Sequence, residues 1–224
     1  MTRGWQSGDE SGPASHGSTL GQRHIGRRAF ISLMAAGFLA LLLGPELLSR
    51  LHSSGFPINS VASGPEFDSS TWRLQVDGLV RQPLDLSFAG FTSLPQVEEA
   101  RDFTCVEGWT VPGVRWKGVT LRELMARADM DPRATHFVFH SGDQVYTDSL
   151  TIDEAFRPDV LLAHEMNGQP LLADHGKPLR LVVPGSYGYK SVKWVTRVEL
   201  ITAGPGGYQG YWEYRGYPAN AEIQ

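Results

Sequence analysis

Residues 161–194, "LLAHEMNGQPLLADHGKPLRLVVPGSYGYKSVKW", carry the clearest pattern in this chain. The apolar start meets Asn167-Gly168, a pair that favours the two-residue turn of a β-hairpin. Two segments rich in aliphatic residues follow at 179–185 and 193–201, and both have the composition of strands. The stretch therefore predicts paired strands joined by loops that are rich in glycine and basic residues.

The rest of the chain alternates in the same way between short apolar segments and turn residues. Thr120 with Glu123 and Thr151 with Glu154 have the spacing of a capping box, so each pair predicts the start of a short helix. The content of 25 glycines and 14 prolines fits a fold with many turns and more strand than helix. We expect a mixed, sheet-dominated α+β domain over residues 56–224. Further strands are predicted at "WRLQVDGLV" (72–80), "PLDLSFAGF" (83–91, a strand and a turn), "VEEARDFTCVEG" (97–108, ending at or near Cys105), "THFVFHSG" (135–142) and "VYTDSL" (145–150).

The composition excludes several classes of protein. The chain has 224 residues, a formal net charge of −4 and one cysteine. This mild acidity argues against a nucleic-acid-binding protein, which usually presents a basic surface. A single cysteine excludes a disulfide framework and a metal site with several cysteine ligands. Neither a Gly-x-Gly-x-x-Gly motif after a strand nor a Walker loop occurs, so nucleotides are not bound in those two ways.

Cys105 is the first candidate for chemistry. A lone thiol is an inert core residue, a nucleophile, a metal ligand or half of an intermolecular bridge. The polar, glycine-containing sequence that follows it makes the core alternative less attractive. Nucleophilic catalysis would need a neighbouring base, and spacing along the chain alone cannot place a particular histidine beside the thiol. The available histidines are His136, His140, His164 and His175.

Two further clusters are candidates for binding. Basic residues gather around glycine turns at 174–194, and backbone N–H groups with basic side chains suit a phosphate, although charges beside a strand are commonly solvated. The aromatic tail "GYQGYWEYRGYP" (207–218) is either a hydrophobic cover over the sheet or the wall of a pocket. Composition leaves both alternatives open in each case. The basic residues are His175, Lys177, Arg180, Lys190 and Lys193.

The first 55 residues differ from the domain in character. Residues 1–22 are rich in glycine and serine, which predicts disorder. Arg27 and Arg28 precede an apolar run over 29–43, and Arg-Arg-x-Phe-Ile resembles a twin-arginine export signal. A buried amphipathic helix fits poorly because the run is apolar on all sides. We expect residues 1–55 to be an export signal or an uncleaved membrane anchor, which places the domain on the periplasmic or cell-surface side of the membrane.

Three segments together resemble the molybdopterin-dependent oxidoreductases that include sulfite oxidases and the catalytic subunits of bacterial methionine sulfoxide reductases. Glu-Met-Asn-Gly, His-Gly-x-Pro-x-Arg and Val-Lys-Trp occur in that order within 161–194, and "CVEGW" (105–109) resembles the sulfoxide reductase version of the cysteine loop. The resemblance covers roughly residues 56 to 218. It implies a sulfite-oxidase-type molybdopterin-binding fold and a molybdenum–molybdopterin cofactor.

The same resemblance implies roles for individual residues of this chain. Cys105 would be the thiolate ligand of molybdenum, and Tyr217 would lie near the side of the metal that bears the substrate. His175 and Arg180 would bind the phosphate region of the pterin. The other cofactor contacts that the resemblance implies are Asn59, Ser141, Ser191, Val192 and Lys193.

Departures from the sulfite oxidases bear on the substrate. Those enzymes have an arginine before the asparagine, where this chain has Ile58, and arginines after the cysteine, where it has Trp109 and Thr110. Because sulfite is an anion that needs such cations, we expect oxygen-atom transfer on an S-oxide instead. The alternatives are a sulfite oxidase with its charge relocated to Arg115 and Arg215, a non-catalytic cofactor-binding redox module, and a thiol enzyme.

The partners follow from the same comparison. The chain has no second cysteine and no haem motif, so electrons would pass to or from a separate protein. A membrane cytochrome or another quinone-linked protein would suit an exported enzyme. The chain ends at Gln224 without the C-terminal dimerisation domain of sulfite oxidases, so we expect a monomer. No nucleic-acid partner is expected.

Overall fold

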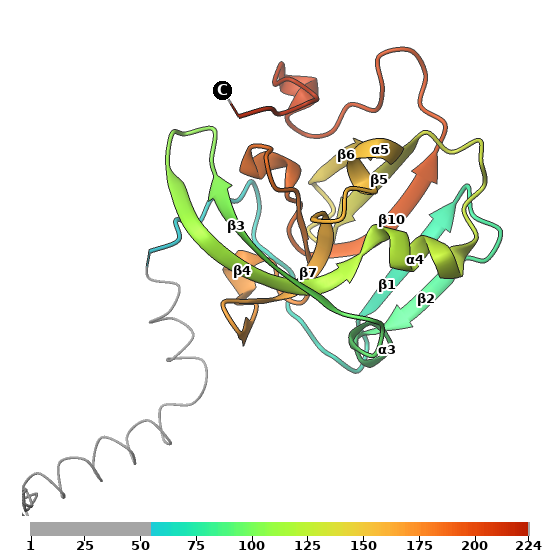
Figure 1. Cartoon of the computed structure of the whole chain (residues 1–224), viewed down its shortest axis with the longest axis horizontal. Helices are drawn as coiled ribbons and strands as arrows, with labels where there is room; N and C mark the ends of the chain where they lie inside the picture. Colours follow the sequence, from blue (N-terminus) through green and yellow to red (C-terminus); the bar gives the residue numbers. More distant parts are fainter. Residues whose placement is uncertain (1–54, 224) are drawn as a thin grey trace, which may run out of the picture. The chain divides into compact units, whose positions relative to one another are not determined.

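The computed structural model describes residues 55–223 (Figure 1). The predicted disordered start and the predicted twin-arginine signal lie outside these residues. Within 55–223, no helix is long and apolar enough to cross a membrane. The predicted boundary between the signal and the domain stays a prediction.

Two β-sheets form the domain, which confirms the predicted sheet-dominated α+β class. The first sheet has the strand order β2-β1-β10-β5-β6, in which β1 and β10 are parallel and the other neighbours are antiparallel. The second sheet has the order β3-β4-β7-β8, and β9 pairs with β7. The first sheet contains β1 (Arg73–Gly78), β2 (Leu84–Ser87), β5 (His136–Ser141), β6 (Thr147–Thr151) and β10 (Val195–Ile201). The second contains β3 (Val97–Thr104), β4 (Thr110–Thr120), β7 (Leu161–Met166), β8 (Gln169–Pro170) and β9 (Arg180–Val182).

The first sheet covers the main core with one face. In β1, Leu74 and Val76 are buried while Arg73 and Gln75 face solvent. Successive side chains of a strand point to opposite faces, so this alternation gives a strand one apolar face and one polar face. Side chains from β5, β6, β10 and α4 complete the main core.

Two strands of the second sheet separate the main core from a smaller apolar cluster. Leu162 of β7 and Leu181 of β9 belong to the main core. Leu161 and Val182, their sequence neighbours on the same strands, belong to the smaller cluster together with Trp116. Both strands are therefore buried on both faces, and each contributes side chains to both clusters. The long β3–β4 hairpin curves beside them, as Figure 1 shows in green.

Two of the short helices, α4 and α5, begin where the sequence predicts them. Thr120 accepts a hydrogen bond from the backbone N–H of Glu123, and Thr151 accepts one from that of Glu154. Only the second pair forms a complete capping box, because the Glu123 carboxylate pairs with Arg127 instead of returning to the backbone. The helices are α3 (Phe88–Thr92), α4 (Leu121–Ala128) and α5 (Ile152–Ala155), with 3₁₀ turns η1 (Ala173–His175), η2 (Gly188–Lys190) and η3 (Glu213–Arg215).

Two segments differ from the sequence-based expectation. Residues 83–91 contain β2 and then α3 rather than a strand and a turn, because the Ser87 hydroxyl accepts a hydrogen bond from the Gly90 N–H and caps a helical turn. β4 is a long strand that composition does not reveal. Pro112 and Gly113 interrupt its start, and both residue types are depleted in strands.

The hairpin predicted at Asn167-Gly168 is confirmed. These two residues link β7 to β8 with φ angles of 54° and 76°, the positive values that a type I′ turn requires. The Asn167 side chain also accepts a hydrogen bond from the backbone N–H of Arg115 at 3.0 Å, which ties the turn to β4. The strands predicted at 72–80, 97–108, 135–142, 145–150, 179–185 and 193–201 correspond to β1, β3, β5, β6, β9 and β10.

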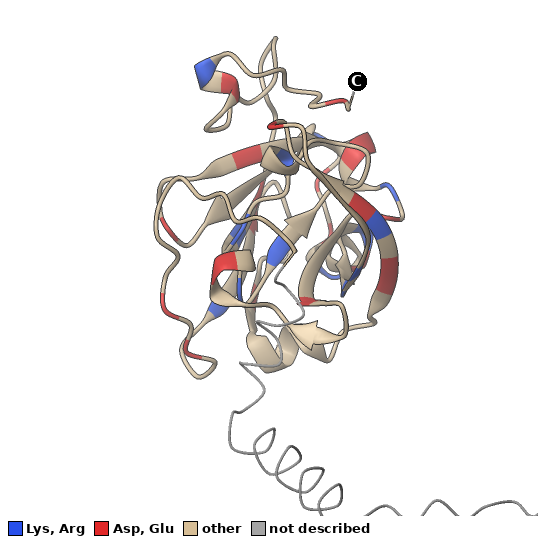
Figure 2. Ribbon diagram, turned by 90° about the vertical axis from the view of Figure 1, so that its left-hand side faces the viewer, with Lys and Arg blue, Asp and Glu red and all other residues tan. Residues whose placement is uncertain are grey.

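Acidic and basic residues are interspersed over the domain (Figure 2). Ion pairs such as Arg133–Asp131 and Arg197–Asp77, each at 2.9 Å, join them across turns and neighbouring strands. Exposed pairs of this kind contribute little to stability, because water and salt screen the attraction between the charges. Arg133 and Arg197 thus have carboxylate partners, whereas Arg180 and Lys193, which line the cavity described below, form no ion pair within residues 55–223.

β4 approaches β7 so closely at Gly118 that no side chain fits there. A Cβ at this position would lie 1.9 Å from the backbone oxygen of Leu162. Gly118→Ala should therefore lower the free energy of unfolding by about 2 kcal/mol or more, because the backbone of one strand has to move. Urea denaturation followed by circular dichroism measures the change. Gly204→Ala is the control, since nothing lies within 4 Å of a Cβ there, and equal midpoints for the two variants would contradict the prediction.

Candidate functional site

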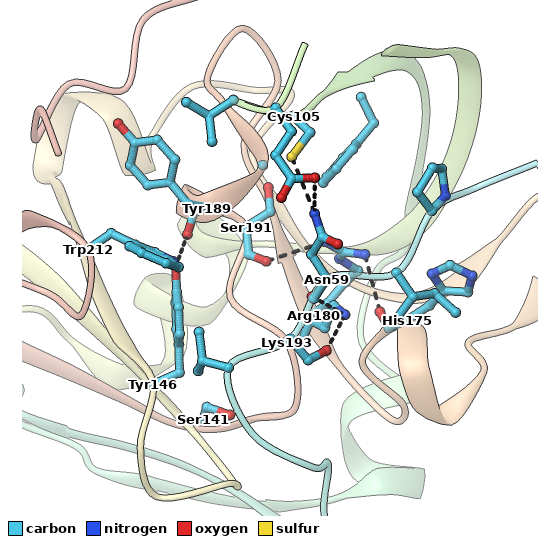
Figure 3. Close-up of a pocket in the computed structure, with 18 of the residues that line it drawn as sticks. Asn59, Cys105, Ser141, Tyr146, His175, Arg180, Tyr189, Ser191, Lys193 and Trp212 are labelled. Atoms are coloured by element: carbon cyan, nitrogen blue, oxygen red, sulfur yellow. Dashed lines mark hydrogen bonds between the residues drawn. The ribbon is translucent and has the colours of Figure 1, made fainter. Parts of the chain in front are cut away.

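A cavity of about 460 Å³ opens between the segment before β1, the end of β3 and the loops around η1 and η2 (Figure 3). Phe56 and Phe103 line it and also pack in the smaller apolar cluster, so that cluster supports the cavity from below. The predicted site residues gather here although they come from distant parts of the sequence. Those that line the cavity are Asn59, Cys105, Ser141, His175, Arg180, Ser191, Lys193 and Tyr217.

Val192 is the predicted site residue that does not line the cavity. Its side chain is buried in the main core. Its carbonyl accepts a hydrogen bond from the N–H of Leu181, and its own N–H donates to the carbonyl of Lys190. Ser191 and Lys193, on either side of it, face the cavity instead. The structure thus gives the Val192 side chain a packing role, and its contact with a cofactor stays a prediction.

Cys105 lies at the start of a tight turn that follows β3, as predicted. Its N–H donates to the carbonyl of Trp109 at 2.9 Å, and its carbonyl accepts from the N–H of Gly108 at 3.0 Å. Gly108 has a φ of 91°, a conformation that glycine adopts readily and other residues rarely do. The turn presents the sulfur to the cavity while the hairpin of β3 and β4 holds its backbone.

Asn59 and Glu107 place polar groups beside the sulfur. The side-chain amide of Asn59 lies 3.8 Å from Sγ of Cys105 and donates to the Glu107 carboxylate at 2.7 Å. The indole N–H of Trp109 donates to the same carboxylate at 3.3 Å, so Glu107 orients both neighbours of the thiol. Across residues 55–223, no hydrogen bond joins Cys105 to an imidazole, so the geometry does not support a cysteine–histidine nucleophile.

Arg180 is a buried cation that forms no ion pair within the described residues. It is 2% exposed, and its guanidinium donates to the carbonyl oxygens of His175 at 3.2 Å and Ser191 at 3.3 Å. It also lies over the rings of Phe103 and Trp116, 5.0 and 5.1 Å from their centroids. Burial lowers its pKa to about 9, and its Nε has no partner in the described part of the chain. A buried guanidinium with an unused donor is suited to an anion.

His175 and Lys193 extend this basic side of the cavity. Burial lowers the pKa of His175 to about 4, and Arg180 and Lys193 add to the effect, so the imidazole is neutral at pH 7. Its buried Nε2 also lacks a partner among residues 55–223. Burial lowers the pKa of Lys193 to about 7, with a further contribution from Arg180. The Lys193 ammonium donates to the carbonyl oxygens of Asn59 and Asp174 at 2.8 and 2.7 Å. An anion bound beside Arg180 and Lys193 would stabilise the charged forms of these two side chains.

The opposite side of the cavity is aromatic, and Figure 3 labels Tyr146, Tyr189 and Trp212 there. We call these three residues together with Tyr217, which also lines the cavity, the aromatic wall. The ring centroids of Trp212 and Tyr217 are 4.9 Å apart, and those of Tyr189 and Tyr217 are 5.5 Å apart. The Tyr146 hydroxyl donates to the carbonyl of Tyr189 at 2.5 Å. Of the two alternatives for the aromatic tail, the pocket wall is therefore correct for Trp212 and Tyr217.

The two arginines that could restore positive charge to the substrate side do not line the cavity. Arg215 donates to the carbonyl of Tyr211 at 2.6 Å, and its guanidinium lies 3.6 Å from the ring centroid of that tyrosine. Arg115 is an exposed residue of β4. Ile58 and Trp109, which stand where sulfite oxidases have arginines, do line the cavity. Positive charge is therefore confined to the side that contains Arg180 in the described structure.

Several lining residues were not predicted as site residues, namely Glu107, Tyr146, Tyr189 and Trp212. Glu107 lies in the cysteine loop and Trp212 in the aromatic tail, and the sequence had already marked both segments as parts of a candidate site. Tyr146 and Tyr189 are 43 residues apart on two separate loops. Only the packing of the two sheets brings them together, and no pattern along the chain indicates that contact.

The chain resembles known oxidoreductases over most of the described domain. Residues 61–212 match the family described as the oxidoreductase molybdopterin binding domain. The oxidoreductase YuiH of Bacillus subtilis is 33% identical over 166 residues, which are 74% of this chain and 82% of that protein. The protein-methionine-sulfoxide reductase catalytic subunit MsrP of Gluconobacter oxydans is 36% identical over 156 residues, which are 62% of this chain and 50% of that protein. This chain thus spans only half the length of the second relative.

A solved structure shows the same architecture. The sulfane dehydrogenase SoxCD from Paracoccus pantotrophus superimposes with a TM-score of 0.58 at 27% sequence identity, over 62% of this chain and 40% of that chain. The likeness agrees with the sulfite-oxidase-type fold that the sequence motifs imply. The shared part includes less than half of the SoxCD chain, so it bears on the domain rather than on the whole of that protein.

The lowered pKa of Lys193 predicts how stability depends on pH. Without a bound anion, the folded protein releases the Lys193 proton near pH 7, whereas an unfolded lysine holds it to about 10.5. The unfolded state therefore binds more protons in this window, and the contribution of Lys193 makes the free energy of unfolding rise with pH from about 7 to about 10.5. Lys193→Met should flatten that rise in urea denaturation curves of cofactor-free protein. Lys117→Met, which alters a lysine outside the cavity, should not, and an equal slope in both variants would contradict the prediction.

Proposed function

This chain belongs to the molybdopterin-binding oxidoreductases, and from that premise we propose that it removes the oxygen atom from a neutral S-oxide. The S-oxide, two protons and two electrons give a thioether and water. The predicted family and the molybdenum–molybdopterin cofactor are confirmed by the family match and the related structure. The substrate class is supported by the name of the MsrP relative and by the aromatic, cation-poor side of the cavity.

The residues of the cavity fit this cofactor. The buried Nε of Arg180 and Nε2 of His175 have no partners within residues 55–223, as expected where an anionic group completes the site. A phosphate there would accept hydrogen bonds from Arg180 and Lys193 and offset charge that burial disfavours. Cys105 supplies a thiolate, which is a soft ligand suited to the metal. A phosphate site and a metal ligand thus face one cavity of about 460 Å³.

The bound cofactor supplies two-electron chemistry, and the chain supplies the geometry. We propose that Cys105 ligates molybdenum. Asn59 and Glu107 then orient the surroundings of the sulfur through their 2.7 Å hydrogen bond. Tyr217 is placed to donate its phenol O–H to the oxygen of the S-oxide, because it lines the aromatic wall and its hydroxyl makes no hydrogen bond within the described residues. A donor at that oxygen would stabilise the negative charge that develops as the S–O bond breaks.

The remaining predicted contacts surround the phosphate and pterin. The Ser191 hydroxyl accepts a hydrogen bond from the N–H of Val183 at 3.2 Å and lines the cavity beside Arg180. The Ser141 hydroxyl accepts one from the N–H of Asp143 at 3.3 Å at the end of β5. We propose that both hydroxyls also contact the cofactor, and that Val192 takes part only by holding Ser191 and Lys193 in place.

A neutral substrate fits the charge distribution of the cavity better than sulfite does. The cations lie on the side that we assign to the phosphate, and the cofactor would neutralise them there. Ile58, Trp109 and the aromatic wall offer apolar surface to the groups attached to sulfur. Sulfite would lose its hydration without gaining a charged donor, which is costly for an oxyanion.

We further propose that the enzyme is exported and receives electrons from a separate redox protein. The twin-arginine-like sequence at residues 27–31 supports export. The description of MsrP as a catalytic subunit supports a second subunit that delivers electrons. A membrane cytochrome or another quinone-linked protein would fill that role.

Molybdenum content and substrate preference test this function. Protein from a host that makes the cofactor should contain close to one molybdenum per chain. It should reduce an aryl methyl sulfoxide with an artificial electron donor, and sulfite oxidation should be at least about tenfold less efficient in kcat/KM. Stoichiometric molybdenum with efficient sulfite oxidation would refute the substrate class alone. Folded protein without molybdenum would refute the assigned site.

Two substitutions separate the roles of metal ligand and phosphate site. Cys105→Ser should lower kcat by about a hundredfold or more while the pterin still copurifies, because the phosphate contacts remain. Arg180→Gln should instead lose most of the pterin and the molybdenum together, since it removes the buried charge that faces the phosphate. Pterin fluorescence after oxidation and elemental analysis measure both. Loss of pterin in Cys105→Ser with full retention in Arg180→Gln would reverse the assignment.

A further inference from the structure

A buried ionic cluster lies beside the aromatic wall and has no role in the function described so far. The Lys190 Nζ lies 2.5 Å from Oδ1 of Asp148 and 2.9 Å from Oε1 of Glu213. The three side chains are only 1–4% exposed. The cluster joins β6, η2 and η3, which are far apart in the sequence. Among the described residues outside the cavity, Lys190 is the buried cation that has two buried carboxylate partners.

Each member of the cluster is next to a member of the aromatic wall along the chain. Lys190 follows Tyr189, and Glu213 follows Trp212. Asp148 lies two residues after Tyr146. The backbone that carries the three charged groups is therefore continuous with the backbone that carries the wall. Tyr217 is coupled to the same unit, because its N–H donates to the carbonyl of Trp212 at 3.1 Å and its ring packs on Trp212 and Tyr189.

The segment that contains Glu213 depends on this cluster more than the other two segments do. η3 belongs to neither sheet, whereas Asp148 is part of β6 and Lys190 is followed closely by β10. The tail is tied to the rest of the domain on both sides of η3: the Tyr211 N–H donates to the carbonyl of Thr147 at 2.8 Å, and the Tyr189 hydroxyl donates to the carbonyl of Pro218 at 2.7 Å. The ion pair of Glu213 is the buried link that starts within η3 itself.

The charges of the cluster do not balance when both carboxyl groups are ionised. Two carboxylates then share one ammonium, and Oδ2 of Asp148 and Oε2 of Glu213 are buried without a partner in residues 55–223. A net charge in such a place is costly, so a proton on one carboxyl group gives the stable state. Burial raises the pKa of Asp148 to about 7; the Lys190 ammonium opposes this rise and the Glu213 carboxylate adds to it.

We propose that Asp148, Lys190 and Glu213 are positioning residues for the aromatic wall of the substrate pocket, and that they position it in the state in which the Asp148 carboxyl group is protonated. The effect on a sulfoxide rests on the proposed function, because the wall is the part assigned to the substrate. The effect on the wall itself does not depend on that function.

Loss of the Asp148 proton should loosen the wall. Two carboxylates in a poorly solvated site repel each other, and Glu213 is the member whose segment is least held. The folded state binds this proton more tightly than the unfolded state does, so the contribution of the cluster to stability is lost as the pH rises through about 7. KM for the substrate should therefore rise above pH 7. The other titratable groups that face the cluster are Tyr146 and Asp143 next to β6 and Tyr189 of η2, and burial together with the carboxylates raises the pKa of both tyrosines, which stay neutral in this range.

Lys190→Met in the molybdenum-loaded enzyme is the first test. It leaves two buried carboxyl groups without a cation, so KM for an aryl methyl sulfoxide should rise about tenfold, with a smaller change in kcat and with molybdenum content unchanged. Hydrogen exchange of residues 208–218 should accelerate. Lys117→Met is the matched control, because it breaks another lysine–carboxylate pair, with Glu165 at 3.0 Å, away from the cavity. Unchanged KM and unchanged exchange in Lys190→Met would overturn the proposal.

Asp148→Asn is the second test, and unlike Lys190→Met it does not leave a buried charge without a partner. Asparagine keeps an oxygen for Lys190 and imitates the protonated carboxyl group. The unmodified enzyme should lose protection of residues 208–218 as pH rises through 7, after correction for the intrinsic exchange rate, and Asp148→Asn should keep it. The same pH dependence in both proteins would overturn the proposal, and this holds even if Lys190→Met does not fold. If no sulfoxide is turned over, the proposed function fails while the exchange measurements still decide the positioning role.

Discussion

The buried guanidinium of Arg180 is the constraint around which the rest of the site is arranged. The protein holds it between two aromatic rings and two carbonyl oxygens and provides no carboxylate of residues 55–223 to balance it. Desolvating a charge in this way costs several kcal/mol, which cation–π contacts and hydrogen bonds only partly offset. The domain is therefore folded around a site that is incomplete without an anion, and binding of the cofactor should stabilise the fold.

The position of that charge explains why the second sheet is built as it is. β9 begins with Arg180 and is buried on both faces, so the guanidinium is anchored by a strand that two apolar clusters hold. Cys105 reaches the same cavity from the end of β3, whose partner β4 contributes Trp116 to the smaller cluster. The proposed metal ligand, Cys105, and the proposed phosphate site at Arg180 are thus attached to paired strands, which hold them at a fixed separation.

Sequence patterns predicted the parts of this arrangement that depend on local chemistry. The Asn167-Gly168 turn, the caps at Thr120 and Thr151, and the end of β3 near Cys105 all follow from short-range rules, and the structure contains them. Composition singled out the cysteine and the basic residues as candidates, and the resemblance to a known family gave them their predicted roles. β4 was missed because its burial comes from pairing with β3 and β7 on either side, which its proline and glycine residues conceal.

Contacts between distant segments were the other part that the sequence could not provide. Tyr146 and Tyr189 form one wall only because the segment before β6 packs against η2. From the sequence, Lys190 would be assigned to a solvated loop, whereas the structure buries it between Asp148 and Glu213. Val192 shows that a motif can also suggest a binding contact for a side chain that packs elsewhere. A motif places it among binding residues, whereas its side chain serves the core. A residue within a binding motif can thus act by holding its neighbours.

The buried charged residues give the two sides of the cavity opposite electrostatic potentials. Arg180 and Lys193 leave an excess of positive charge on one side of the cavity. Asp148 and Glu213, with a single lysine between them, leave an excess of negative charge beside the aromatic wall once Asp148 loses its proton. An anion is drawn toward the first side, where the cofactor phosphate fits, and is disfavoured at the second. A neutral S-oxide meets neither penalty, since its dipole needs only a hydroxyl donor such as Tyr217. The buried charges on both sides of the cavity therefore support the proposed neutral substrate, in addition to the absence of arginines at positions 58 and 109.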